Sequence, residues 1–133
     1  MSSRYSPASL RAFEFFFRPW MRRRLHGEYF AGLPSKSLGN RAMLLVANHV
    51  SWWDGFILRE LHRMMRPRAP LYTVMAEEQL RRVPYFRRLG VLGINRGEPA
   101  SILRALRELD RHLQDHPGAL VVFFPQGRIW PSH

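Results

Sequence analysis

Two kinds of hydrophobic pattern alternate along this chain. A short continuous apolar run, which is typical of a buried strand in a parallel sheet, occurs at 42–47, and further strands are predicted at 69–77, 91–95 and 119–125. Between these segments, apolar residues recur every three or four positions, which predicts helices over 51–65, 78–90 and 99–115. Strands that alternate with helices predict an α/β fold, a layered and mostly parallel sheet flanked by helices.

Capping and breaking residues refine the helices that follow the strands. We expect Ser51 to cap the first helix, Pro84 to interrupt the second, Gly90 to end it, and Pro99 to occupy the first turn of the third. Apolar residues on one face of each helix are predicted to be buried. In the first helix these are Trp53, Ile57, Leu61 and Met64 or Met65, and in the third Ile102, Leu103, Leu106, Leu109 and Leu113.

Residues 1–40 differ from the rest of the chain, and we expect them to form basic, aromatic, amphipathic helices ahead of an α/β domain at 41–133. Ser9 is a plausible N-cap, and Pro19 is predicted to kink or end the first helix near Arg18. The helical spacing is carried by Leu10, Phe13, Phe16, Phe17, Trp20 and Met21. Residues 32–40, rich in Gly, Ser and Pro, are predicted to be a loop.

Composition adds a strong positive charge to this picture. The chain has 133 residues, which suits one domain, and 46% of them are hydrophobic, which favours a globular protein. It has no cysteine, so disulfides and thiolate zinc sites are excluded. The 21 Lys and Arg against 10 Asp and Glu give a net charge of +11, which favours polyanionic partners: nucleic acid, anionic lipid or phosphorylated substrates.

The charge of the amino-terminal segment favours a membrane surface. No apolar run is long enough to span a bilayer, but the aromatic cluster of the first helix is followed directly by the arginine triplet 22–24. Interfacial helices use such rings at the acyl boundary and such cations on headgroups. We therefore expect a peripheral protein at the cytoplasmic face of an anionic membrane. The alternative is a helix packed on the core with a solvated basic face.

Polar residues follow three of the predicted strands, at the places where α/β sheets collect their functional groups. Asn48 and His49 follow the first strand, and Asn95 and Arg96 follow the third. Pro125, Gln126, Gly127 and Arg128 follow the fourth. Arg96 could hold a phosphate, and the Pro-Gly turn could let backbone N–H groups approach an anion. The alternatives are a solvated arginine and an ordinary strand-ending turn.

His49 and Asp54 are a candidate base and its orienting acid. On one helix, five residues would leave the two side chains about 140° apart, so they can meet only if His49 lies in the turn between strand and helix. A neutral imidazole can take a proton from an alcohol near neutral pH, and a carboxylate on its other nitrogen fixes the tautomer. The alternative is an aspartate that merely caps a helix. The sequence has neither G-x-S-x-G nor H-E-x-x-H, and predicts no metal site.

Together the three blocks resemble the glycerolipid acyltransferase family, whose best-known members are the 1-acyl-glycerol-3-phosphate (lysophosphatidic acid) acyltransferases. The family's first motif, N-H-x-x-x-x-D, matches Asn48, His49 and Asp54. The second, a glycine, an apolar strand and an arginine, matches Gly90 and Arg96. The third, F-P-E-G-T-R, is matched in part by Phe124, Pro125 and Gly127.

The resemblance implies an enzyme that moves a fatty acyl group to a glycerol-phosphate or lyso-lipid acceptor, in phospholipid biosynthesis or remodelling. The donor, acyl-CoA or acyl-carrier protein, would be a co-substrate, and no cofactor is expected. His49 would deprotonate the acceptor hydroxyl, Asp54 would orient His49, and Arg96 would hold the acceptor phosphate. The rest of the expected substrate-binding set is Asn48, Gly90, Phe124, Pro125, Gln126, Gly127 and Arg128. Trp52 and Trp53 could line the acyl path or pack in the core.

Two departures from the family pattern define the alternatives. Gln126 stands in place of the family's glutamate, and Arg128 follows the glycine directly because the threonine is missing. The chain also ends soon after Arg128, where the family normally continues, so we expect a truncated form. A catalytically silent, membrane-surface member of the same fold is therefore one alternative. A basic nucleic-acid-binding module is another, although the aromatic residues crowd into apolar runs rather than interleaving with the basic positions.

Overall fold

The computed structural model describes residues 4–33 and 39–126, and it confirms the predicted α/β class. The order of elements alternates as expected. They are α1 (Pro7–Arg24), β1 (Met43–Val46), α2 (Asp54–Met65), β2 (Leu71–Ala76), α3 (Glu77–Arg82), the 3-10 helix η1 (Pro84–Leu89), β3 (Val91–Ile94), α4 (Pro99–Asp115) and β4 (Leu120–Phe123).

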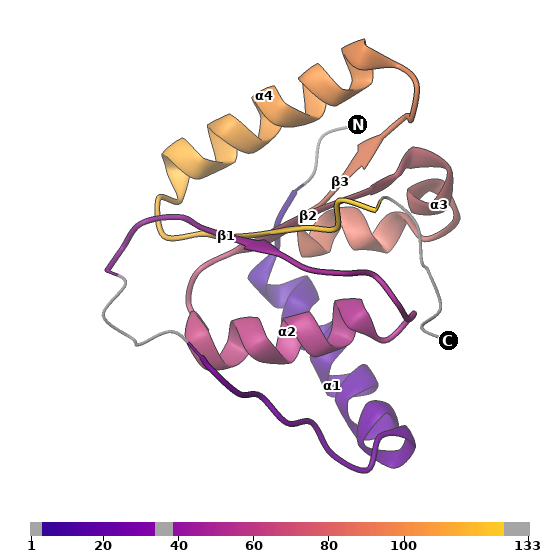
Figure 1. Cartoon of the computed structure of the whole chain (residues 1–133), viewed down its shortest axis with the longest axis vertical. Helices are drawn as coiled ribbons and strands as arrows, with labels where there is room; N and C mark the ends of the chain where they lie inside the picture. Colours follow the sequence, from indigo (N-terminus) through magenta and orange to yellow (C-terminus); the bar gives the residue numbers. More distant parts are fainter. Residues whose placement is uncertain (1–3, 34–38, 127–133) are drawn as a thin grey trace.

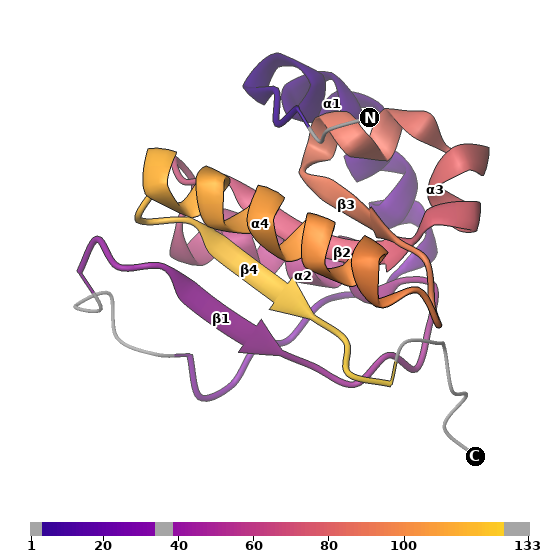
Figure 2. The same cartoon turned by 90° about the horizontal axis from the view of Figure 1, so that it is seen from above.

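The sheet is parallel throughout and its strands lie in the order β1-β4-β2-β3. Helix α4 covers one face, whereas α2 and α1 lie on the other (Figure 1). Because all strands run the same way, the residues that follow them come to one edge of the sheet (Figure 2). The fold therefore places the turns after β1, β2, β3 and β4 side by side, as the sequence analysis required for a shared site.

The core lies between α4 and the sheet. Tyr72 from β2, Leu92 from β3, Ala105 from α4 and Ala119, next to β4, form its buried cluster. The Tyr72 ring also stacks on His112 of α4, with 4.8 Å between ring centroids. Small residues at the helix–sheet contact let α4 approach the strands closely.

The predicted buried face of α4 is wrong in part. Leu109 and Leu113 pack against the core, but the residues of α4 that are buried are Ser101 and Ala105. Ile102, Leu103 and Leu106 are about half exposed instead. The small Ser101 and Ala105 side chains face the strands, so the helix is rotated away from the position that an apolar count predicts.

Strand β1 was predicted as a buried strand, and this is also wrong in part. Within residues 4–33 and 39–126 it pairs only with β4 and forms one side of the sheet. Two of its side chains, Leu44 and Val46, are 65% and 56% exposed. Leu44 is in register with Val121, and Val121 with Tyr72, whose ring stacks on His112 of α4, so Leu44 and Val46 lie on the α4 face of the sheet. Helix α4 does not extend over β1 (Figure 2).

Helix α1 begins earlier and continues further than the sequence predicted. Its N-cap is Ser6, whose hydroxyl accepts a hydrogen bond from the Ser9 N–H at 3.2 Å, so Ser9 lies in the first turn. Pro19 lies inside the helix and does not end it. The carbonyl that loses its partner to Pro19 belongs to Phe15, a 76% exposed residue at which water can replace the missing N–H. Within the described part of residues 1–40, α1 is the one helix, where several were expected.

Of the remaining capping predictions, the one for Ser51 is wrong and the others are confirmed. Helix α2 begins at Asp54, and Ser51 lies ahead of it, so Ser51 is not its cap. The interruption at Pro84, the stop at Gly90 and the place of Pro99 in the first turn of α4 are confirmed. In the residues that the structure covers, no helix combines the length and the apolar character needed to cross a bilayer.

Candidate active site

The turn between β1 and α2 brings His49 and Asp54 together. Imidazole Nδ1 lies 2.9 Å from Asp54 Oδ2, which is hydrogen-bond distance. Asp54 is the first residue of α2, and His49 lies in the turn after β1, so the chain bends between them. This strand–turn–helix geometry gives the contact that a single continuous helix would forbid.

Asp54 also organises the backbone of the turn. The same Oδ2 atom accepts hydrogen bonds from the N–H groups of Val50, at 2.7 Å, and Ser51, at 2.9 Å. The carboxylate is therefore both a local brace at the start of α2 and the partner of the imidazole. The sequence left two interpretations of Asp54 open, a partner of His49 and a residue that merely caps a helix, and in this fold one carboxylate makes both kinds of contact.

Two residues after β4 fix the position of His49 from the other side. The ring of Phe124 stacks on the imidazole, with 4.4 Å between centroids and 28° between planes. The Gln126 side-chain oxygen accepts a hydrogen bond from the His49 backbone N–H at 2.6 Å. The amide at position 126 thus keeps the acceptor oxygen that the family glutamate would offer, without its charge.

The open atom of His49 is Nε2. A carboxylate can only accept, so the contact with Asp54 places the ring proton on Nδ1 and leaves the Nε2 lone pair unprotonated in the neutral form. Within the described residues, Nε2 has no hydrogen-bond partner. The His49 side chain is 24% exposed, so a ligand can reach it. The site can accept one proton from a bound hydroxyl.

The other predicted site residues lie in different surroundings. Asn48 and Pro125 are exposed at the carboxyl edge of the sheet beside His49. Gly127 and Arg128 lie outside the described residues. Gly90 lies at the amino end of β3, and so at the opposite edge of the sheet from His49. It has φ of 90°, and a Cβ there would lie 2.1 Å from the Leu71 carbonyl oxygen, so a backbone requirement explains this glycine.

Arg96 stands at the tip of the loop after β3. Its side chain is exposed and makes no hydrogen bond or ion pair with the described residues. The loop is braced beneath it, because Asn95 donates from its side chain to Glu98 at 2.9 Å and from its backbone to the Ser101 hydroxyl at 2.9 Å. Hydrogen bonds from Asn95 and Arg104 lower the pKa of Glu98. The guanidinium is therefore available to an anion, although β4 and β2 lie between its strand and that of His49.

An aromatic surface adjoins the turn of His49. Trp52 is 57% exposed and stacks on Phe56, with 5.0 Å between centroids. Phe56 in turn stacks on Phe17 of α1 at 5.0 Å, and Trp53 stacks on Trp20 of α1 at 5.1 Å. Trp53 therefore packs between helices, whereas Trp52 presents an open apolar face in the segment between β1 and α2 that also carries His49. Sequence spacing alone could not separate these two neighbours.

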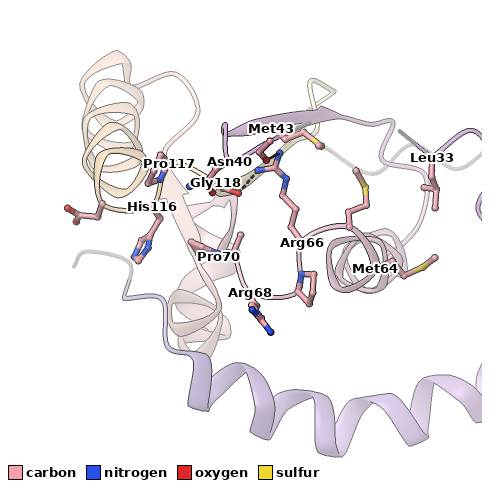
Figure 3. A pocket seen from close by; sticks show the side chains of 15 residues that line it. Leu33, Asn40, Met43, Met64, Arg66, Arg68, Pro70, His116, Pro117 and Gly118 are labelled. Carbon is pink, nitrogen blue, oxygen red and sulfur yellow. Dashed lines mark hydrogen bonds between the residues drawn. The ribbon is translucent and has the colours of Figure 1, made fainter. Parts of the chain in front are cut away.

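The larger of two cavities lies elsewhere. It has a volume of about 770 Å³ and is formed at the amino edge of the sheet (Figure 3). Arg66 crosses it and donates to the carbonyl oxygens of Arg41 and Gly118, so this arginine clamps the start of β1 to the start of β4. None of the predicted site residues lines it, and we do not assign chemistry to it. Among the described residues, no three His, Asp or Glu side chains are grouped as a metal site would require.

One of three comparisons with known proteins gave a match. A family model described as Acyltransferase matches residues 22–133, which is most of the chain and includes the turns after all four strands. Most of α1 precedes the matched range. Searches of curated proteins and of solved structures gave no match.

Proposed function

The chain belongs to the acyltransferase family, and on that premise we propose that it transfers a fatty acyl group from a thioester to the hydroxyl of a lipid precursor. The donor is acyl-CoA or acyl-carrier protein, and the acceptor is a glycerol phosphate or a lyso-lipid, as in phospholipid biosynthesis or remodelling. The observation that carries the proposal is the 2.9 Å contact between His49 Nδ1 and Asp54 Oδ2, which leaves Nε2 open.

The chemistry follows from the open nitrogen. The acceptor hydroxyl gives its proton to His49 Nε2 as its oxygen attacks the thioester carbonyl carbon. Asp54 stabilises the imidazolium that forms. When the tetrahedral intermediate collapses, the carbon–sulfur bond breaks and the thiolate takes the proton back from Nε2. The products are an ester and a free thiol, and the imidazole is regenerated.

The acceptor's phosphate is proposed to bind at Arg96. Parallel strands lie about 4.8 Å apart, so three spacings separate the β1 and β3 positions by about 14 Å. His49 and Arg96 both follow strands of the parallel sheet and so lie at the same edge, where a small phosphate-bearing alcohol is proposed to bridge them. Asn48, Phe124, Pro125 and Gln126 border the same edge, and Gly127 and Arg128, which follow in the sequence, are proposed to belong to the same site.

The acyl chain is proposed to leave the site over Trp52 and toward a membrane on which α1 rests. Phe15 and Phe16 of α1 are 76% and 73% exposed, and the last turn of the helix carries Arg22, Arg23 and Arg24. Exposed rings beside a cluster of cations suit an anionic bilayer surface. We therefore propose a peripheral protein at the cytoplasmic face of a membrane.

Thioester turnover tests the catalytic proposal. The chain has no cysteine, so a thiol-reactive dye reports only the thiol released from acyl-CoA. We expect thiol release with a lyso-lipid acceptor to fall at least about a hundredfold in His49→Ala, the usual contribution of a general base. His116→Ala, which removes an exposed imidazole at the other edge of the sheet, should retain activity. A folded wild-type chain that releases no thiol would favour the silent-member alternative.

Vesicle flotation tests the membrane proposal separately. Phe15→Ser with Phe16→Ser should abolish flotation with anionic vesicles. Leu103→Ser with Leu106→Ser is the matched control, because these exposed apolar residues belong to α4, which lies on the opposite face of the sheet. Loss of flotation in the α4 variant alone would mean that the membrane contacts the α4 face of the protein, and this would refute the proposal.

A further inference from the structure

A second cleft, with a volume of about 490 Å³, runs along the outer side of β3 between α3, η1 and α4. Arginine dominates its lining. The charged residues that line it are Arg81, Arg87, Arg104, Arg107, Arg111, Glu77 and Glu108. Five positive and two negative side chains leave an excess of three positive charges in a small space. Neither the sequence analysis nor the family match assigns a role to this cleft.

The arginines come from three elements, α3, η1 and α4, that only the fold brings together. Arg104, Arg107 and Arg111 are spaced by three and four residues, so they form one stripe along α4. Arg81 approaches from α3, on the other side of β3 (Figure 2). The spacing on α4 is visible in the sequence, but the opposing arginine is not, because it depends on how α3 and α4 pack around the strand.

A single carboxylate organises one side of the cleft. Glu77 lies 2.5 Å from Arg87 and 3.5 Å from Arg81. It lies directly over Gly93, where a Cβ atom would lie 1.7 Å from Glu77 Oε2. The glycine in β3 therefore makes room for the carboxylate, and the carboxylate neutralises the α3 side in part.

The α4 side keeps its charge. Arg107 and Arg111 make no ion pair with the residues that the structure describes. Arg104 pairs with Glu98 at 3.2 Å, but both side chains are well exposed, so water and ions screen this pair. Guanidinium groups offer several donors in a fixed plane, which suits phosphate oxygens better than it suits a single carboxylate.

We propose that this cleft binds phosphate groups of the thioester donor, the phosphorylated nucleotide end of acyl-CoA. This inference rests on the proposed acyl transfer. The relevant chemistry, a phosphate ester held by arginines, is shared by CoA, by a phosphorylated acceptor and by free phosphate. Distance favours CoA among these three.

The distance argument uses the layout of the sheet. The cleft lies beyond β3, at least three strand spacings or about 14 Å from the strand that precedes His49. The arginine stripe then extends about 10 Å further along α4, which runs back from the carboxyl edge. A glycerol phosphate whose phosphate binds at Arg96 cannot also reach Arg107 and Arg111 further along α4, because only a few bonds separate its reacting hydroxyl from its phosphate. CoA carries its phosphates on a long flexible arm and can.

Calorimetry tests the inference without turnover. The full chain carrying His49→Ala, which should not consume thioester, is titrated with CoA, 3′-dephospho-CoA, sn-glycerol 3-phosphate and inorganic phosphate. Adding Arg107→Ala and Arg111→Ala should raise the Kd for CoA at least about tenfold, since each lost phosphate contact weakens a charge-assisted bond. The Kd for 3′-dephospho-CoA should rise less. Adding Arg41→Ala and Arg68→Ala, two exposed arginines at the amino edge, should change neither by more than about twofold.

The outcomes separate the two proposals. An unchanged Kd for CoA in the α4 variant, or an equal rise in the control, overturns the inference. Loss of glycerol phosphate or inorganic phosphate binding with CoA binding intact also overturns it, because the site would then serve the acceptor or a free anion. CoA binding that depends on Arg107 and Arg111, in a protein whose wild type releases no thiol, supports the cleft while refuting acyl transfer.

Discussion

Replacing Asp54 with Asn isolates what the carboxylate does for the imidazole from what it does for the fold. Asp54 Oδ2 accepts three hydrogen bonds: one from His49 and two from the backbone N–H groups of Val50 and Ser51. An Asn side-chain oxygen can keep the two backbone bonds, so the free energy of unfolding should fall by less than about 1 kcal/mol. The Asn side chain has no charge to stabilise an imidazolium, although the oxygen that keeps the backbone bonds also accepts from Nδ1–H, because one atom accepts all three bonds. The substitution therefore removes the charge and keeps the tautomer of the ring.

The catalytic loss should therefore be much larger than the stability loss. In a serine protease triad, the same substitution lowers kcat about 10⁴-fold, or about 5.5 kcal/mol, through the wrong tautomer. Here the tautomer is kept and the His49 side chain is 24% exposed, so water can compensate in part, and we expect a smaller fall in kcat/KM, of about 10². Asp54→Ala should match that loss and also lower the free energy of unfolding by about 1–3 kcal/mol, since the two backbone donors lose their acceptor.

Thiol release from acyl-CoA measures the rate, and urea unfolding measures the stability. Asp115→Asn is the matched control, an exposed carboxylate at the end of α4, and both quantities should stay unchanged in it. If Asp54→Asn unfolds at the wild-type urea concentration and keeps more than about a third of the activity, Asp54 only starts a helix. The catalytic interpretation of the His49 turn would then be lost.

Three further predictions concern stability, each measured by urea unfolding. Glu14→Gln removes the ion-pair partner of Arg59 on α2, whose side chain is 12% exposed, so the free energy of unfolding should fall by about 2–3 kcal/mol. A loss no larger than that of Glu78→Gln, which breaks an exposed ion pair, would contradict this prediction. Gly90→Ala combines a positive φ with a backbone clash and should cost more than Gly97→Ala, whose positive φ meets open space; equal losses would show that the clash is relieved. Burial lowers the pKa of His62 to about 4, below its usual 6.5, so the unfolded state binds more protons than the folded state between these pH values. The free energy of unfolding should therefore fall by up to about 3 kcal/mol as the pH drops from 7 to 4. His62→Gln should flatten this pH dependence, and an equally steep curve in that variant would show that other groups cause it.

The sequence predicted the alternation of strands and helices and the contact between His49 and Asp54, because both depend on local patterns. Strand runs, helical spacing and the turn at residues 48–53 are encoded within a few residues of one another. Gly90 was different. It was expected beside the substrate, yet its φ and its approach to the Leu71 carbonyl explain it as a backbone requirement at the far edge of the sheet.

What the sequence could not predict depended on packing between distant segments. The helical spacing predicts that Leu103 and Leu106 of α4 are core residues, but they are exposed because Ser101 and Ala105 face the sheet instead. The second cleft could not be predicted for the same reason, since α3, which carries Arg81, and α4 meet across β3 only in the folded chain. The cap of α1 was predicted at Ser9 rather than at Ser6, because a serine three residues later offers the same side-chain hydroxyl.

The attachment of α1 to α2 has a pharmacological consequence. Glu14 and Arg18 of α1 pair with Arg59 and Glu60 of α2, and the same α2 begins with Asp54. From Asp54 to Arg59 the helix is a single rod about 7.5 Å long, so a displacement at the ion pairs is transmitted to the carboxylate. A small molecule wedged between these two helices would pull the acid away from its imidazole. Under the proposed function, an inhibitor therefore need not resemble the acyl donor or the acceptor, or bind beside His49.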